Sequence, residues 1–237
     1  MSREATLGIC FPQGTENLPG KTKILLIRHC EAAGNTEGVF QGRIDTDISP
    51  NGEKQLELLA LRCRNMKIDA MVTSPLLRAV RTAEAVNQYH RLPLETEPLL
   101  AEIDAGAFEG VKWEELPLRF PEATRQWYEE PWNFQAPGGE SMRQVYERVW
   151  KGILQVVERH RGQTVCVASH GCAIRNLLCR AKGLPIERIG EIPWLDNTAL
   201  SVLEFSGESC VGVPLMGDAS HLSPETSSFA SQSWWKQ

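Results

Sequence analysis

Three short apolar runs along the chain have the pattern of strands buried in a parallel sheet. Each contains β-branched or other apolar residues and ends in polar ones, and they cover residues 24–27, 69–73 and 163–169. Apolar residues recur every three or four positions elsewhere, which predicts helices over residues 50–66, 75–86 and 141–156, with another at 173–183. This alternation predicts an α/β fold with a mostly parallel central sheet and helices on both faces.

Serine and proline mark where these helices start. Ser49-Pro50 and Ser74-Pro75 each combine a capping side chain with a proline suited to the first turn, and Ser141 opens a long amphipathic helix. Residues 92–100 predict a short strand and turn. Residues 198–205 alternate in polarity, which predicts one antiparallel edge strand, with residues 210–213 as its partner.

Residues 112–134 predict one or two short helices of a different kind, because they carry large aromatic side chains that include Trp113, Phe120, Trp127, Tyr128 and Trp132. That much aromatic surface indicates a lid or cap. The predicted organisation is a flexible arm at residues 1–21, one domain at 22–216 and a disordered, Ser-rich tail at 217–237.

Composition limits which binding partners and which cellular location are expected for the protein. The 237 residues carry a formal net charge of −5, which argues against nucleic acid and anionic membranes as partners. No apolar run approaches the roughly 20 residues that span a bilayer, and the N-terminus lacks the pattern of a signal peptide. The seven cysteines contain no CxxC pair, which indicates reduced thiols in a cytoplasmic protein. The sequence leaves a homo-oligomer open.

Basic side chains, arginine or histidine, follow all three predicted parallel strands. The first strand ends in Arg28-His29, the second leads to a helix whose first turn holds Arg78, and the third ends in His170-Gly171. Each residue alone is more often structural. Because parallel strands end at the same edge of a sheet, however, these groups are expected to meet there. Arginines, histidines and helix N-termini together predict an anion site suited to phosphate.

Several motifs are similar to those of a known family. Arg28-His29, followed by Glu31 and Asn35, resembles the RHGxxxxN signature of the histidine phosphatase superfamily, which also contains the cofactor-dependent phosphoglycerate mutases. Five further segments resemble the family's motifs in the same order: Gln41-Gly42-Arg43 with Asp45, residues 74–84, residues 100–110, residues 137–141, and residues 169–175. The resemblance extends over residues 23–206 and implies a phosphoglycerate mutase-like fold.

The resemblance also implies a mechanism and a set of site residues. His29 is expected to be the nucleophile that forms a phosphohistidine, and Glu102 the proton donor to the leaving alcohol. The expected phosphoryl-binding catalytic residues are Arg28, Arg78 and His170, with further substrate contacts from Asn35, Gln41, Gly42 and Gly171. The arginines can balance the charge of the phosphate, so no metal and no cofactor is expected.

The expected function is hydrolysis of a small phosphate ester. The segment from Trp127 to Ser141 resembles that of the α-ribazole phosphatases and, nearly as well, that of the broad-specificity phosphatases. One alternative is a cofactor-dependent phosphoglycerate mutase. Another is a weakly active phosphate-binding protein, because Cys30 stands where the family signature has glycine. A metal site at His29, Cys30, His170 and Cys172 lacks zinc-ligand spacing, and the nearby arginines would repel a cation.

Overall fold

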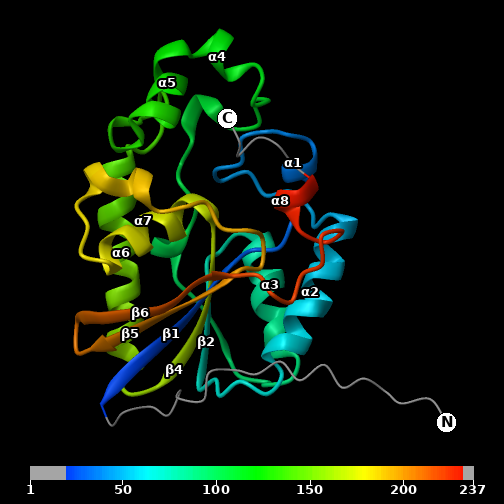
Figure 1. The fold of residues 1–237 in the computed structure, drawn as a ribbon, viewed down its shortest axis with the longest axis vertical. Helices are drawn as coiled ribbons and strands as arrows, with labels where there is room; N and C mark the ends of the chain where they lie inside the picture. The colour runs from blue at the N-terminus through cyan, green and yellow to red at the C-terminus, as the bar shows by residue number, and fades with distance from the viewer. Residues whose placement is uncertain (1–19, 232–237) are drawn as a thin grey trace, which may run out of the picture.

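The computed structural model describes residues 20–231, which form one six-stranded sheet with helices around it (Figure 1). The strands are β1 (Lys21–Arg28), β2 (Ala70–Thr73), β3 (Leu94–Thr96), β4 (Thr164–Ser169), β5 (Leu200–Ser206) and β6 (Ser209–Asp218), in the spatial order β3-β2-β4-β1-β5-β6. The first four are mutually parallel, and β5 runs antiparallel to both β1 and β6. The mostly parallel sheet and its antiparallel edge are confirmed, with β6 as the outermost strand on that side.

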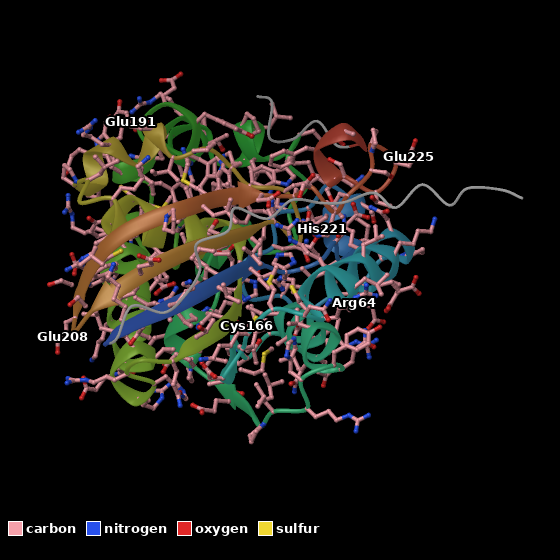
Figure 2. All side chains as sticks on the ribbon, turned by 60° about the horizontal axis from the view of Figure 1, so that its bottom comes forward. Arg64, Cys166, Glu191, Glu208, His221 and Glu225 are labelled. Carbon is pink, nitrogen blue, oxygen red and sulfur yellow. The ribbon has the colours of Figure 1, made fainter. Side chains whose placement is uncertain are left out.

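Helices cover both faces of the sheet, as predicted. Helices α6 (Met142–Arg159) and α7 (Gly171–Ala181) lie on one face, and α2 (Pro50–Cys63) and α3 (Leu77–Asn87) on the other (Figure 1). Alternate side chains of β1 pack into the two hydrophobic cores on opposite faces of the sheet. Ile24 and Leu26 belong to the core under α6 and α7, and Leu25 and Ile27 to the core under α2 and α3. Figure 2 shows Cys166 of β4 within the interior, whereas Glu208 lies at the periphery.

Two of the three predicted serine starts are confirmed. The Ser49 side chain accepts a hydrogen bond from the Gly52 amide at the start of α2, and Ser141 forms a capping box with Gln144 at the start of α6. The prediction that Ser74-Pro75 begins a helix is wrong.

Helix α3 begins at Leu77 instead, because its first amide is satisfied from elsewhere in the chain. The Leu77 amide donates to both carboxylate oxygens of Asp45, at 2.8 and 2.9 Å. The Ser74 hydroxyl lies 2.6 Å from His170 Nε2. A loop carboxylate therefore caps α3, and the serine contacts the histidine at the end of β4.

Short helices form the predicted cap beyond the carboxyl ends of the strands. Residues 112–134 contain α4 (Leu116–Arg119), α5 (Pro121–Glu129) and the 3-10 helix η3 (Pro131–Asn133), which lie at the top of Figure 1. Trp127 packs at its centre, 4.9 Å from the ring of Phe40 and 4.8 Å from that of Phe134, measured between centroids. The remaining short helices are α1 (Ala33–Thr36), η1 (Pro98–Leu100), η2 (Gly106–Phe108), η4 (Ile186–Glu191) and α8 (Ser228–Ser231).

The predicted disorder of the tail is wrong for residues 217–231. Strand β6 extends to Asp218, and the following residues pack back onto the domain and end in α8. Serine hydroxyls that suggested disorder make buried hydrogen bonds instead, such as Ser228 Oγ to Glu31 at 2.9 Å. The predicted arm lies outside the described residues up to residue 19, as does the tail from residue 232. None of the helices within residues 20–231 has the length and apolar character needed to cross a membrane.

Candidate active site

The carboxyl ends of β1 and β4 meet the start of α7 beside a pocket. Six of the predicted site residues line it: Arg28, His29, Asn35, Gln41, Glu102 and Gly171. Two more, Arg78 and His170, are fully buried and lie next to His29 without lining the pocket. The structure thus brings together the groups that the sequence placed at separate strand ends.

His29 is held in one tautomer by its own backbone. Its Nδ1 lies 2.6 Å from the carbonyl oxygen of Cys30. A carbonyl can only accept, so Nδ1 carries the proton and Nε2 has the lone pair. Burial, followed by the positive charges of Arg78 and Arg28, holds the pKa of His29 well below its usual range. His29 therefore presents a neutral imidazole nitrogen, the form that can act as a nucleophile.

The two arginines are positioned by loop carbonyls. Arg78 donates from its two terminal nitrogens to the carbonyls of Gly42 and Ile44, both at 2.8 Å, while its buried Nε has no hydrogen-bond partner among residues 20–231. Arg28 donates to the carbonyl of Leu195. Burial lowers the pKa of Arg28 to about 10, against the opposing charges of Asp196 and Glu102. At neutral pH Arg28 stays positively charged, and an anion entering the site meets a fixed cation.

His170 is the second histidine of the site. Its ring centroid lies 5.2 Å from that of His29, and its Nε2 is fixed by Ser74. Its Nδ1 is buried and lacks a hydrogen-bond partner in the described part of the chain. Burial and then Arg78 hold the pKa of His170 well below its usual range. The ring is thus a neutral hydrogen-bonding group beside the His29 ring.

Glu102 is anchored by the N-terminus of α7. Its carboxylate accepts hydrogen bonds from the amides of Ile103 at 2.9 Å and of Cys172 and Ala173, both at 3.0 Å. These donors favour the charged form, but the larger effect is burial, which raises the pKa of Glu102. A carboxyl group with a raised pKa beside a phosphate-binding site is suited to proton transfer.

Arg148 of α6 fixes the backbone around Glu102. It donates to the carbonyls of Leu99, Ala101 and Glu102, and forms a bidentate pair with Glu140 at 2.7 and 2.8 Å. Glu140 also accepts from the amide of Asp104, at 2.9 Å. The chain on both sides of Glu102 is therefore tied to a single ion pair.

Glu109 organises the loop that holds Arg78. Its carboxylate accepts from the amides of Gly42, Arg43, Ile44 and Ala105 at 2.7 to 3.2 Å. A Cβ atom at Gly42 would lie 2.2 Å from a Glu109 oxygen, so only glycine fits this approach. Gly42 does not line the pocket, and its carbonyl accepts from Arg78, so the structure shows it supporting that arginine; its contact with substrate stays a prediction.

Two predicted amide side chains line the pocket. Gln41 accepts a hydrogen bond from Thr46 through Oε1, while its buried Nε2 has no partner within residues 20–231. Asn35 accepts from the amide of Ala32 through Oδ1 at 3.0 Å. In both side chains the oxygen is engaged by the protein, which orients the amide nitrogen as a donor.

The outer wall of the pocket is aromatic. Three tryptophans line it, Trp113, Trp127 and Trp194, and Trp127 stacks on Trp194 with centroids 5.7 Å apart. Arg175 lies over the Trp194 ring, 4.7 Å from its centroid. The sequence pointed to the aromatic residues of the cap but not to Trp194. The signal available was a tryptophan in the loop immediately before the predicted edge strand.

Cys30 does not obstruct the pocket. Its sulfur faces α3, 4.0 Å from the carbonyl oxygen of Arg78, and its amide donates to Thr82 Oγ1 at 2.9 Å. Among non-glycine residues of the described chain, positive φ occurs only at Arg91 and Thr198, so the backbone at Cys30 does not require glycine. The steric reason for expecting weak activity is thereby removed.

Cys30 is expected to be inert in the folded protein. Burial raises the pKa of its thiol to about 12, so the reactive thiolate is scarce at neutral pH. Iodoacetamide labelling followed by peptide mass spectrometry should leave Cys30 unmodified until the protein is denatured, and Cys30→Gly should retain turnover within about threefold. Rapid labelling of native Cys30 would contradict this expectation.

No group of three or more histidine, cysteine, aspartate or glutamate side chains in the described ranges has the arrangement of a metal site. Of the four residues considered as ligands from the sequence, His29 and His170 lie close to Arg28 and Arg78, Cys30 faces the Arg78 carbonyl, and Cys172 lies at the start of α7.

Comparisons with known proteins agree with the site. Residues 24–215 match the histidine phosphatase superfamily (branch 1). The chain is 37% identical to "Phosphoserine phosphatase 1" of Hydrogenobacter thermophilus over 184 residues, 77% of this chain and 86% of that protein. Among solved structures, Bacillus stearothermophilus YhfR is similar with a TM-score of 0.80 at 28% identity, covering 84% of this chain and 98% of that one.

The alpha-ribazole phosphatase from Shigella flexneri is also similar, with a TM-score of 0.73 at 25% identity, covering 83% of this chain and 96% of that one. The family match extends over most of the chain and includes every motif on which the resemblance was based. The chain is therefore a phosphatase of the histidine phosphatase superfamily.

Proposed function

We propose that this phosphatase hydrolyses a small phosphorylated metabolite through a phosphohistidine formed on Nε2 of His29. The observation that carries the proposal is the hydrogen bond from His29 Nδ1 to the Cys30 carbonyl. It directs the lone pair to Nε2, in a ring that also borders the pocket and lies close to two arginines. A neutral, oriented imidazole next to fixed cations is what attack on a phosphoryl group requires.

The proposed reaction has two steps. In the first, Nε2 of His29 attacks phosphorus, the P–N bond forms, and the P–O bond to the alcohol breaks while Glu102 gives that oxygen a proton. In the second, the Glu102 carboxylate takes a proton from water, which attacks phosphorus and releases inorganic phosphate and the neutral histidine. Dividing hydrolysis in this way replaces one difficult displacement with two easier ones.

Fixed donors are proposed to bind the phosphoryl oxygens throughout. Arg28 and Arg78 supply charge, and Asn35, His170 and the α7 N-terminus at Gly171 supply further hydrogen bonds. The unpartnered nitrogens of Arg78 and His170 support this assignment, because buried donors normally have partners and a bound phosphate would provide them. Gln41 is proposed as an outer contact through its Nε2.

The substrate is proposed to be α-ribazole 5'-phosphate or a phosphate ester with a similar ring. Of the described residues that line the pocket, Arg28 and His29 are the basic ones, and both belong to the phosphoryl site. The leaving alcohol would instead meet Trp113, Trp127 and Trp194, surfaces suited to stacking on a flat ring. A carboxylate on the alcohol, as in phosphoserine, would have no cation of its own in this wall.

Trp194→Ala should separate these substrate classes. We expect kcat/KM for α-ribazole 5'-phosphate to fall about tenfold, as the loss of one aromatic contact predicts, with little change for glycerol phosphate, which has no ring. Steady-state phosphate release with both substrates and phosphoserine measures this. The ring assignment is wrong if phosphoserine is the better substrate of the unaltered protein. Phosphate release without an isomerised product also distinguishes hydrolysis from the mutase reaction.

We further propose that the protein acts in the cytoplasm, in agreement with the six unpaired cysteines found within residues 20–231.

A further inference from the structure

We infer that residues 219–231, here called the C-terminal strap, position the catalytic end of β1. The strap lies beyond residues 24–215, the part of the chain that matches the family. It runs from the end of β6 to α8 and contacts segments that directly follow or adjoin Arg28 and His29 (Figure 1). The inference rests on the proposed function, since it assigns the strap a role through those two residues.

The first set of contacts fixes Glu31, which lies two residues after His29. Ser228 Oγ donates to one Glu31 oxygen at 2.9 Å, and Ser49 Oγ donates to the other at 2.7 Å. The Thr226 carbonyl accepts from Asn51 and Gln55 of α2. Glu31 and Ser228 are both buried, so the carboxylate depends on these protein donors rather than on water.

The second set fixes Asp196, in the loop before β5. Ser227 Oγ donates to one Asp196 oxygen at 2.5 Å, and the Ser228 amide donates to the other at 3.1 Å. The charge of Asp196 is the strongest influence that opposes the lowering of the Arg28 pKa by burial. Asp196 is therefore the main counter-charge of Arg28, and the strap sets its orientation.

The same loop also binds the backbone of the proposed nucleophile. Asn197 Nδ2 donates to the His29 carbonyl at 2.8 Å, and the Thr198 amide donates to the Arg28 carbonyl at 3.0 Å. Thr198 has a φ of 58°, which is strained for a β-branched residue. Its hydroxyl lies 3.0 Å from Nε2 of His221 in the strap, shown in Figure 2. The strained residue Thr198 is thus bound to β1 through its amide and to the strap through its hydroxyl.

Adjacent strap residues therefore join the segment after His29 to the loop that holds Arg28 and His29. Without the serine donors, two buried carboxylates would lose hydrogen bonds and turn toward other partners. The strap hydrogen-bonds to Glu31, Asp196 and Thr198, around the residues proposed to bind the phosphoryl group, whereas Glu102 is held by the start of α7. Its loss should consequently weaken phosphate binding equally for all esters, whatever their alcohol.

The experiment compares Ser228→Ala and the less buried Ser227→Ala with Ser223→Ala, an exposed strap serine, as the matched control. For each variant, kcat and KM are measured with p-nitrophenyl phosphate and glycerol phosphate, together with the inhibition constant of inorganic phosphate and the melting temperature. We expect the phosphate inhibition constant and KM to rise about tenfold in the first two variants, the effect of one lost buried hydrogen bond to a charged group. Both esters should be affected alike, and Ser223→Ala should be unchanged.

The inference is overturned if Ser227→Ala or Ser228→Ala, folded at the assay temperature, keeps the unaltered constants while only its melting temperature falls. That result would give the strap a purely stabilising role. If the unaltered protein hydrolyses no ester, the proposed function fails instead. Calorimetric binding of inorganic phosphate to the same variants then decides the inference separately, since equal affinity in Ser228→Ala and the unaltered protein would overturn it.

Discussion

Turnover of phosphate esters is expected to fall by roughly 10⁴-fold or more when His29 is replaced by alanine, as for removal of a covalent nucleophile. The reason is that Nε2 of His29 is the oriented lone-pair nitrogen among the cations of the pocket. Phosphate release from p-nitrophenyl phosphate measures the loss. Mass spectrometry of protein quenched during turnover should find the phosphoryl group on His29.

His160→Ala is the control for this experiment. His160 lies at the end of α6, where it contacts Glu95 and precedes the amino end of β4, whereas the pocket lies at the carboxyl ends of the strands. It should retain the activity of the unaltered protein. Turnover by His29→Ala at a comparable rate would exclude the phosphohistidine mechanism.

Glu102→Gln is expected to act through the leaving group. With glycerol phosphate, whose alkoxide must be protonated, turnover should fall about 10²- to 10⁴-fold, the range for general acid catalysis. With p-nitrophenyl phosphate the leaving phenolate is stable without a proton, so the first step should be affected far less. The pair of substrates, assayed with Glu102→Gln and with the exposed control Glu114→Gln, measures this difference. An equal loss with both substrates would indicate that Glu102 limits the hydrolysis of the phosphohistidine, the step that the two substrates share, and not protonation of the leaving alcohol.

The dependence of activity on pH is expected to follow from the titration of Glu102 and His29. Burial raises the pKa of Glu102, so its acid form persists to a higher pH than that of an ordinary carboxyl, and activity with alkyl esters should decline as pH rises through that pKa. The pKa of His29 is lowered well below 6.5, so loss of the nucleophile by protonation should occur only at more acidic pH. In a profile of kcat against pH, Glu102→Gln should abolish the decline at high pH and keep the decline at low pH.

The strand ends could be predicted because their signals are local. An apolar run ending in Arg28-His29, or in His170-Gly171, predicts both a strand and the polar side chains at its carboxyl end. Because parallel strands end at the same edge of a sheet, these side chains are then expected to lie together. The same local reasoning found Ser141 at the start of α6, where the capping partner is three residues away. In each case the cause and its effect lie within a few residues.

Contacts between distant segments could not be predicted in this way. Glu109 binds the amide of Gly42, 67 positions earlier, and Ser228 binds Glu31 across 197 positions. Serine-rich composition alone indicates disorder, yet a buried carboxylate makes a serine hydroxyl a favourable partner. The start of α3 was misplaced for a related reason, because Asp45 in a remote loop caps it.

The start of α7 contributes both to the proposed phosphoryl site and to the binding of the proposed acid, Glu102. The first residue of α7, Gly171, borders the pocket beside Arg28, and the next two amides, of Cys172 and Ala173, bind Glu102. The spacing between the proposed acid and the proposed phosphoryl site is therefore set by consecutive peptide units of this helix. A substitution in the aromatic wall would then change which alcohol is favoured while the interval between acid and phosphorus stays constant.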